Sequence, residues 1–118
     1  MQETWRLQFN NDAGAQPLDT IMEEIIRKNR KELGIFLSYY TRKEGAVAEN
    51  VCLLGSVNFN EKLKGDFILS FTKEYFNACL NIHEKESSQM KIDFSIDLNK
   101  GQIDFIGPYL PERELDEL

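Results

Sequence analysis

Hydrophobic and polar residues alternate near the start of the chain. Trp5, Leu7 and Phe9 share one side of an extended segment, and polar residues occupy the other side. A period of two is typical of a strand with one buried face. The pattern therefore predicts a half-buried strand over 4–10, followed by a loop over 11–14.

A spacing of three to four residues replaces this alternation in the next segment. The apolar positions that share one helical face are Leu18, Ile21, Met22, Ile25, Ile26 and Leu33. This spacing predicts a long amphipathic helix over 17–33. Pro17 suits the first helical turn, and Gly34 is a typical residue at which a helix ends.

The segment over 35–42 is apolar on both of its alternating faces, which predicts a central strand buried on both sides. Two further strands are predicted around 51–59 and over 67–71, because apolar residues alternate there as well. Gly55 lies in the middle of the first of these strands. A glycine at such a position indicates a bulge or a close approach of the backbone.

Residues 73–84 fit two structures. In a helix, Thr72 would be the N-cap, and Phe71 and Phe76 would form a hydrophobic staple. In a strand, the apolar residues of the same segment alternate equally well. We favour the helix, because neither a glycine nor an Asn-Gly pair is present to turn the chain tightly after Phe71. The strand stays as the alternative.

The clearest hairpin lies near the end of the chain. Apolar residues alternate over 90–98 and 102–106, and Asn-Lys-Gly supplies the turn between them. Together the elements predict an α+β fold. We expect a single-layer antiparallel sheet of about five to six strands, with one long amphipathic helix packed on one face and a possible second helix. We also expect one domain over 1–107 and an acidic C-terminal tail over 108–118.

The predicted core combines inward positions of these elements. Its expected members are Trp5, Ile25, Leu37, Leu53, Leu69, Phe94 and Phe105. Hydrophobic residues make up 42% of the chain and charged residues 29%, which is the composition of a globular protein and argues against disorder. No apolar run approaches the roughly 20 residues of a membrane span, and no secretion signal is visible. We therefore expect no membrane association and a cytoplasmic location. Cys52 and Cys79 are expected to be reduced and buried.

Charge is distributed unevenly along the chain. The net charge is −6, of which residues 1–83 carry −1 and residues 84–118 carry −5. An acidic surface repels phosphates, so nucleic acid and anionic membrane are poor partners. A basic protein is a more natural partner. The plainer interpretation is that the charge serves solubility alone.

Three aspartates are candidates for a binding surface. Asp93 and Asp97 are predicted to face outward on one strand of the final hairpin, and Asp104 on the other. Asp93 and Asp97 would lie about 13 Å apart, which is too far for two carboxylates to share a proton or a water. The pattern favours a solvated face or an acidic docking surface for a basic partner, with Glu112 and Glu114 of the tail contributing.

Two other constellations have plain structural explanations. Cys79 and His83 would share a helical face as a thiolate–imidazole dyad or half of a metal site, but no nearby Cys or His completes either site. The basic run over 27–31 could meet a phosphate. We interpret it instead as a solvated end of the predicted helix, where the dipole favours cations.

No phosphate-binding loop, hydrolase elbow or dinucleotide fingerprint is present, and we expect no cofactor and no metal. The absence of recognisable chemistry favours a non-enzymatic protein-binding module. Its most concrete form is a small acidic inhibitor, such as an immunity protein that neutralises a basic nuclease toxin. An accessory subunit or small-ligand-binding domain with a cavity between sheet and helix is the alternative, followed by an enzyme of unrecognised type. If the aspartates do not bind, the helix surface around Glu24, Arg27 and Lys31 is the next candidate interface.

Overall fold

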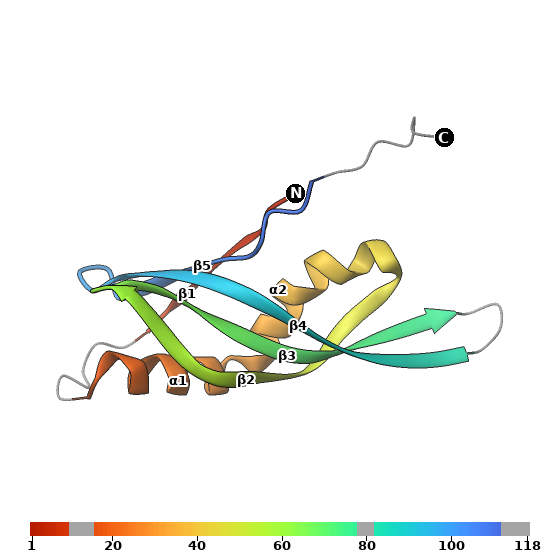
Figure 1. Ribbon diagram of the computed structural model, residues 1–118, viewed down its shortest axis with the longest axis horizontal. Helices are drawn as coiled ribbons and strands as arrows, with labels where there is room; N and C mark the ends of the chain where they lie inside the picture. Colours follow the sequence, from red (N-terminus) through yellow and green to blue (C-terminus); the bar gives the residue numbers. More distant parts are fainter. Residues whose placement is uncertain (10–15, 78–81, 112–118) are drawn as a thin grey trace.

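The computed structural model describes residues 1–9, 16–77 and 82–111 of the chain. Its elements are β1 (Thr4–Gln8), α1 (Leu18–Lys28), α2 (Arg30–Thr41), a 3-10 turn η1 (Arg42–Glu44), β2 (Ala46–Glu61), β3 (Lys64–Asn77), β4 (Ile82–Asp97) and β5 (Gln102–Ile106). Figure 1 shows one sheet with the two helices beside it. The predicted α+β class is confirmed.

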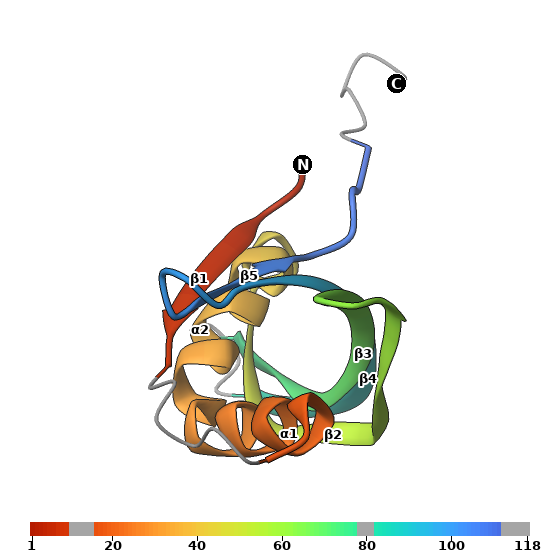
Figure 2. The ribbon, with the colours of Figure 1, turned by 90° about the vertical axis from the view of Figure 1, so that its left-hand side faces the viewer.

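The sheet has five strands in the order β1-β5-β4-β3-β2, and every neighbouring pair is antiparallel. Both helices lie between β1 and β2 in the sequence. The sheet curves around them, as the end-on view in Figure 2 shows. We call the side of the sheet that turns toward the helices the inner face, and the opposite side the outer face.

The core fills the space between the inner face and the helices. Phe67 packs against the rings of Phe94 and Phe105, with centroids 6.0 and 5.6 Å away. Five of the seven predicted core residues are buried, and Trp5 and Leu53 are partly buried and pack against the same cluster. For the five of these residues that lie on strands, alternation was a reliable guide to the inner face, whereas Ile25 and Leu37 are buried on α1 and α2.

The prediction of one helix over 17–33 is wrong at its C-terminal end. Helix α1 ends at Lys28, Asn29 leaves helical geometry with φ −113° and ψ 29°, and α2 begins at Arg30. The side-chain amide of Asn29 donates a hydrogen bond of 2.8 Å to the carbonyl oxygen of Ile25. The same carbonyl accepts the backbone N–H of Asn29 at 3.1 Å, so both bonds hold Asn29 at the end of α1, and α2 runs in a new direction from there (Figure 1).

The predicted strand over 35–42 is also wrong, because residues 35–41 belong to α2 and Arg42 begins η1. Its buried residues follow a helical spacing: Leu33, Gly34, Phe36, Leu37, Tyr40 and Thr41. Gly34 does not end a helix. A Cβ atom there would lie 3.3 Å from the carbonyl oxygen of Ala48, so the glycine allows α2 to pack closely on β2.

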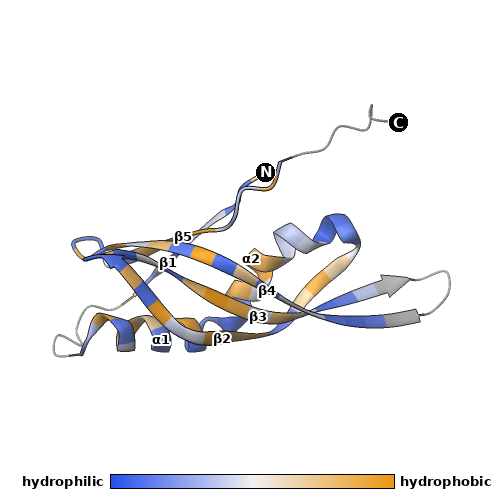
Figure 3. Ribbon diagram, viewed as in Figure 1, coloured by the Kyte–Doolittle hydropathy of each residue, from blue (hydrophilic) through white to orange (hydrophobic). Residues whose placement is uncertain are grey.

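The favoured helix over 73–84 is wrong, and the strand alternative is correct for the part that can be described. β3 continues to Asn77 and β4 begins at Ile82, and the two strands pair without a break from Lys64↔Ser95 to Asn77↔Ile82. Residues 78–81 lie outside the described residues. The far portion of this pair, residues 71–77 and 82–88, forms an arm that extends past the helices and is largely hydrophilic (Figures 1 and 3).

Strand β2 lies at one edge of the sheet, and its edge is partly covered. The backbone N–H of Ala48 donates to the hydroxyl of Ser38 at 3.0 Å, and the hydroxyl of Thr41 donates to the carbonyl of Ala46 at 2.8 Å. The pairing of β2 with β3 shifts register on either side of Leu53, and Gly55 has φ 77°. The predicted bulge at Gly55 is confirmed. Bulges and hydroxyl caps both discourage another strand from pairing here.

Candidate functional site

The three predicted aspartates all lie on the outer face of the β4–β5 hairpin. They alternate with Phe94, Ile96 and Phe105, which are buried on the inner face. The alternation of the hairpin thus brings the carboxylates to one side of the sheet. Their immediate surroundings nevertheless differ.

Asp104 forms an ion pair with Arg6, which lies directly opposite on β1. Arg6 Nε is 2.6 Å from Oδ1 of Asp104, and a second guanidinium nitrogen is 3.3 Å from Oδ2. The hydrogen bond and charge of Asp104 raise the pKa of the Arg6 guanidinium. This bidentate geometry balances the charge of Asp104 locally.

Asp97 supports the turn that joins β4 to β5. Its carboxylate accepts a hydrogen bond of 3.1 Å from the backbone N–H of Lys100. An aspartate that bonds to a backbone N–H a few residues later commonly stabilises a turn. Asp97 therefore has a structural role in addition to its position on the outer face.

Asp93 faces a residue that the sequence analysis missed. Its cross-strand partner on β3 is Asp66, so two carboxylates stand directly opposite each other. Lys91 Nζ is 3.9 Å from Asp66, and the amide of Asn58 donates to Asp66 at 3.4 Å. We call Asp66 and Asp93 the acidic pair. Like charges at directly opposed positions destabilise a sheet, so this pair costs the fold some stability.

The remaining charge on this part of the outer face is mixed. Lys64 lies opposite Ser95, between the acidic pair and Asp97, and it adds a cation to those of Arg6 and Lys91. Glu112 and Glu114, the predicted contributors from the tail, lie outside the described residues. Residues 112–118 hold four acids and one base, so they carry −3 of the net charge of −6. The acidic pair, and not a broad acidic field, distinguishes the described surface.

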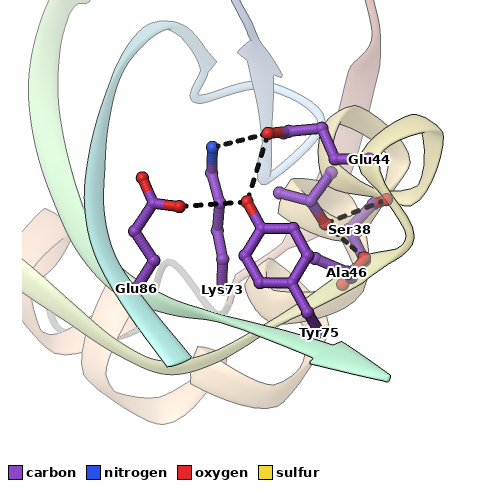
Figure 4. A network of polar contacts seen from close by, with 7 residues as sticks. Ser38, Glu44, Ala46, Lys73, Tyr75 and Glu86 are labelled. Atoms are coloured by element: carbon purple, nitrogen blue, oxygen red, sulfur yellow. Dashed lines mark hydrogen bonds and ion pairs between the residues drawn. The ribbon is translucent and has the colours of Figure 1, made fainter. Parts of the chain in front are cut away.

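A second polar cluster joins η1 to the arm (Figure 4). The hydroxyl of Tyr75 lies 3.1 Å from a carboxylate oxygen of Glu86 and 3.3 Å from one of Glu44. Lys73 Nζ lies 3.1 Å from the same oxygen of Glu44. Desolvation, followed by the hydrogen bond to Glu86 and the nearby charge of Glu44, raises the pKa of Tyr75 to about 12.

This cluster braces the structure and does not resemble a catalytic base. A phenol with a pKa of about 12 keeps its proton at neutral pH. The Tyr75 hydroxyl has one proton to donate, and Lys73 already donates a hydrogen bond to Glu44. We therefore assign the hydrogen bond donated by Tyr75 to Glu86. Among the described residues no group of three or more His, Cys, Asp and Glu side chains is arranged to hold a metal ion.

A groove of about 700 Å³ runs between α2 and β2. Its apolar lining includes Gly34, Ile35, Val47, Ala48 and Val51. Arg30 and Lys31 line the end nearest the start of α2. Sequence reasoning missed the groove, because it assigned residues 35–42 to a strand.

The position of these two cations corrects the interpretation of the basic run. Arg27 and Lys28 do lie in the last turn of α1, where the helix dipole favours cations. Arg30 and Lys31 instead occupy the first turn of α2, where the dipole is unfavourable to them. Dipole stabilisation therefore does not explain why these two residues are basic.

Cys52 is exposed, so the prediction that it is buried is wrong. Its sulfur lies 3.7 Å from a guanidinium nitrogen of Arg30. Both residues line a smaller hollow of about 250 Å³ beside the groove. Cys79 lies outside the described residues, as does the side chain of His83, so the proposed dyad has no described geometry.

Neither helix of the described chain is long and apolar enough to cross a membrane. No family model matches the sequence, and no curated protein or solved structure matches it either.

Proposed function

We propose that this protein is a non-enzymatic protein-binding module that holds a basic partner on the outer face of its sheet. In its most concrete form it is a small acidic inhibitor, such as an immunity protein that neutralises a basic nuclease toxin. The observation that supports this proposal best is the acidic pair. Two carboxylates placed directly opposite each other oppose folding of the free protein. Local violations of folding rules are expected at functional sites, where a ligand can compensate for them.

A cation from a partner would relieve this repulsion. An arginine or lysine inserted between Asp66 and Asp93 would contact two carboxylates at once. Its electrostatic attraction would be stronger than that of a single surface ion pair. Lys91 is within 3.9 Å of Asp66 but is itself largely exposed, so it leaves room for a second cation. Asp104 contributes less, because Arg6 already neutralises it.

Apolar side chains flank the acidic pair on the same face. Ile106 lies directly opposite Asp93 on β5, and Ile68 follows Asp66 on its own side of β3. Leu54, which is opposite Ile68 on β2, is 46% exposed. Interfaces typically combine apolar contacts with a few well-placed charges. The outer face offers both within a small area.

The test compares two double charge reversals that change net charge equally. Asp66→Lys with Asp93→Lys removes the acidic pair, and Glu23→Lys with Glu84→Lys changes exposed acids on α1 and the arm. A partner captured by the wild-type protein is purified, and its association rate with each variant is measured across a range of salt concentrations. We expect the first variant to associate at least tenfold more slowly and to lose most of its salt dependence, because a local charge contact has been reversed.

The matched control separates local from global electrostatics. The Glu23 and Glu84 variant should keep most of the wild-type rate. If both variants slow association to the same degree, the effect comes from net charge alone and the acidic pair is not the docking site. If neither variant changes the rate or the salt slope, the outer face does not bind the partner.

A further inference from the structure

The groove between α2 and β2 exposes apolar side chains that the fold does not require at its surface. Ile35 is 46% exposed and Val47 is 37% exposed, and both line the groove. Ala48 and Val51 also line the groove, and both are buried members of the core. Solvent-exposed apolar side chains that meet in a hollow indicate a binding surface more strongly than scattered ones do.

The charged residues that line the groove are two cations at its α2 end, Arg30 and Lys31, and one acid on β2, Glu49. Neither Arg30 nor Lys31 lies within ion-pairing distance of a carboxylate in the ranges 1–9, 16–77 and 82–111. Both occupy the first turn of α2, where the helix dipole adds positive potential, and Glu32 follows them in the same turn. Two cations without an ion-pair partner at the N-terminus of a helix favour an anion beside them.

Recognition in the groove must come from side chains and not from strand addition. Two β2 backbone groups at this edge are already engaged, since Ala48 N–H donates to Ser38 and Ala46 C=O accepts from Thr41. An extended peptide that pairs with a sheet edge needs these main-chain groups to be free. The occupant is therefore a molecule whose contacts are an apolar chain and a negative head.

We propose that the groove binds an amphipathic carboxylate, with its hydrocarbon chain along Ile35 and Val47 and its carboxylate beside Arg30 and Lys31. The groove volume of about 700 Å³ lies within the range of small-molecule sites, which is about 300–1,000 Å³. Charge complementarity selects the head group, and the apolar wall selects the chain. This inference is independent of the outer face and of the proposed protein partner.

The probe is dodecanoate, titrated below its micelle concentration into the full chain and followed by calorimetry and by amide chemical shifts. We expect saturable one-to-one binding, with shift changes concentrated at Ile35 and Val47. Dodecyltrimethylammonium has the same chain and the opposite charge, and it should bind at least tenfold more weakly. Octanoate should also bind more weakly, because it buries less apolar area.

Two pairs of variants assign the contacts. Arg30→Glu with Lys31→Glu should lower dodecanoate affinity at least tenfold, whereas Lys62→Glu with Lys85→Glu, which reverses two exposed lysines elsewhere, should not. Ile35→Ser should weaken binding, whereas Leu54→Ser changes a side chain of equal exposure, 46%, on the outer face and should not. Denaturant unfolding confirms that each variant is folded.

Several outcomes would overturn the proposal. One is the absence of saturable dodecanoate binding to the wild-type protein. Another is equal binding of the carboxylate and the trimethylammonium probe, or equal losses in the groove variants and their controls. Concentration-dependent self-association that Val47→Asp abolishes, without dodecanoate binding, would assign the groove to a second copy of the chain. Binding of an acidic peptide in the groove without dodecanoate binding would assign it to a protein segment.

Discussion

Tyr40 shows how one side chain can join three segments of the chain. Its hydroxyl accepts a hydrogen bond of 2.8 Å from the backbone N–H of Glu3 and donates one of 3.0 Å to the carbonyl of Pro108. Gly107 makes the contact possible, because a Cβ atom at that position would overlap the Tyr40 ring. The residue thus ties α2 to the segments that flank β1 and β5.

Removing this hydroxyl should destabilise the protein. We expect Tyr40→Phe to lower the free energy of unfolding by about 1–3 kcal/mol, because two part-buried hydrogen bonds are lost and a backbone N–H is left without its acceptor. Tyr39→Phe is the matched control, since no hydrogen bond of the Tyr39 hydroxyl is found in the described chain. Urea unfolding midpoints measure both. Equal midpoints for the two variants would contradict the role assigned to Tyr40.

Tyr75 should make stability sensitive to alkaline pH. Its pKa in the folded protein is about 12, which is above the value of about 10 expected in the unfolded chain. The contribution of the neutral phenol is therefore complete below about pH 10 and is lost as pH rises toward about 12. Tyr75→Phe should reduce the loss of stability over this window, as measured by urea midpoints at successive pH values.

Tyr40 also affects how the stability of the protein depends on alkaline pH. Burial also raises the pKa of Tyr40, so this residue contributes to alkaline sensitivity in the same direction. The Tyr75→Phe variant should therefore keep the part of the alkaline loss of stability that comes from Tyr40. If its pH profile runs parallel to that of the wild-type protein between pH 10 and 12, Tyr75 is not coupled to folding.

At the scale of elements, the sequence predicted the strands of the final hairpin better than the helices that connect β1 to β2. The β4–β5 hairpin was predictable because its inner positions, such as Phe94 and Phe105, alternate strictly and a glycine turn joins them. Helix α2 over 30–41 was not predictable from the sequence, because it is apolar on more than one side and because a glycine such as Gly34 is typical of the end of a helix. The glycine at position 34 is explained by the close approach of Ala48 on β2. Because this contact is between two elements, the pattern within α2 does not reveal it.

The arm shows a second limit of prediction from local sequence pattern. The segment over 73–84 fits a helical and a strand period equally well, so local pattern could not decide between them. The pairing of β3 with β4 over its described length decided in favour of the strand. Tyr75, Lys73 and Glu86 then meet through cross-strand neighbours that no sequence spacing reveals.

Gly65 tests the packing of two adjacent strands. A Cβ atom at this position would overlap the backbone carbonyl of Asn58, at the irregular part of β2. We expect Gly65→Ala to lower the free energy of unfolding by about 3 kcal/mol, because backbone and not a flexible side chain must move. Gly55→Ala has open space around it and should cost about 1 kcal/mol for its positive φ. Equal losses in thermal or urea unfolding would argue against this close approach.

The candidate sites were predictable in part, for similar reasons. Alternation alone placed Asp93, Asp97 and Asp104 on one outward surface. The opposition of Asp66 and Asp93 depends on the register of β3 and β4, which alternation does not set. The groove depends on how closely α2 approaches β2. Features within one hairpin could thus be anticipated, and features between elements could not.

For the molecule as a whole, the distribution of charge matters more than its sum. Of the net charge of −6, residues 112–118 carry −3 and Asp12 carries −1, so the residues that the structure describes carry −2. The described body is therefore close to neutral, and its surfaces differ locally: an acidic pair on the outer face and two cations at the groove. Each of these local imbalances should lower the stability of the free protein and favour a ligand of opposite charge.

This view predicts that a substitution in the acidic pair stabilises the free protein. Asp93→Asn keeps the shape of the side chain and removes the repulsion with Asp66, so we expect the free energy of unfolding to rise by about 0.2–1 kcal/mol. The gain should shrink in 1 M salt, where charges are screened beyond about 3 Å. Asp97→Asn is the control, and it should be neutral or destabilising because the Asp97 carboxylate accepts from Lys100. Urea unfolding at low and high salt measures both variants. A loss of stability in Asp93→Asn at low salt would mean that Asp93 supports the fold, and the electrostatic case for a partner's cation at this position would fail with it.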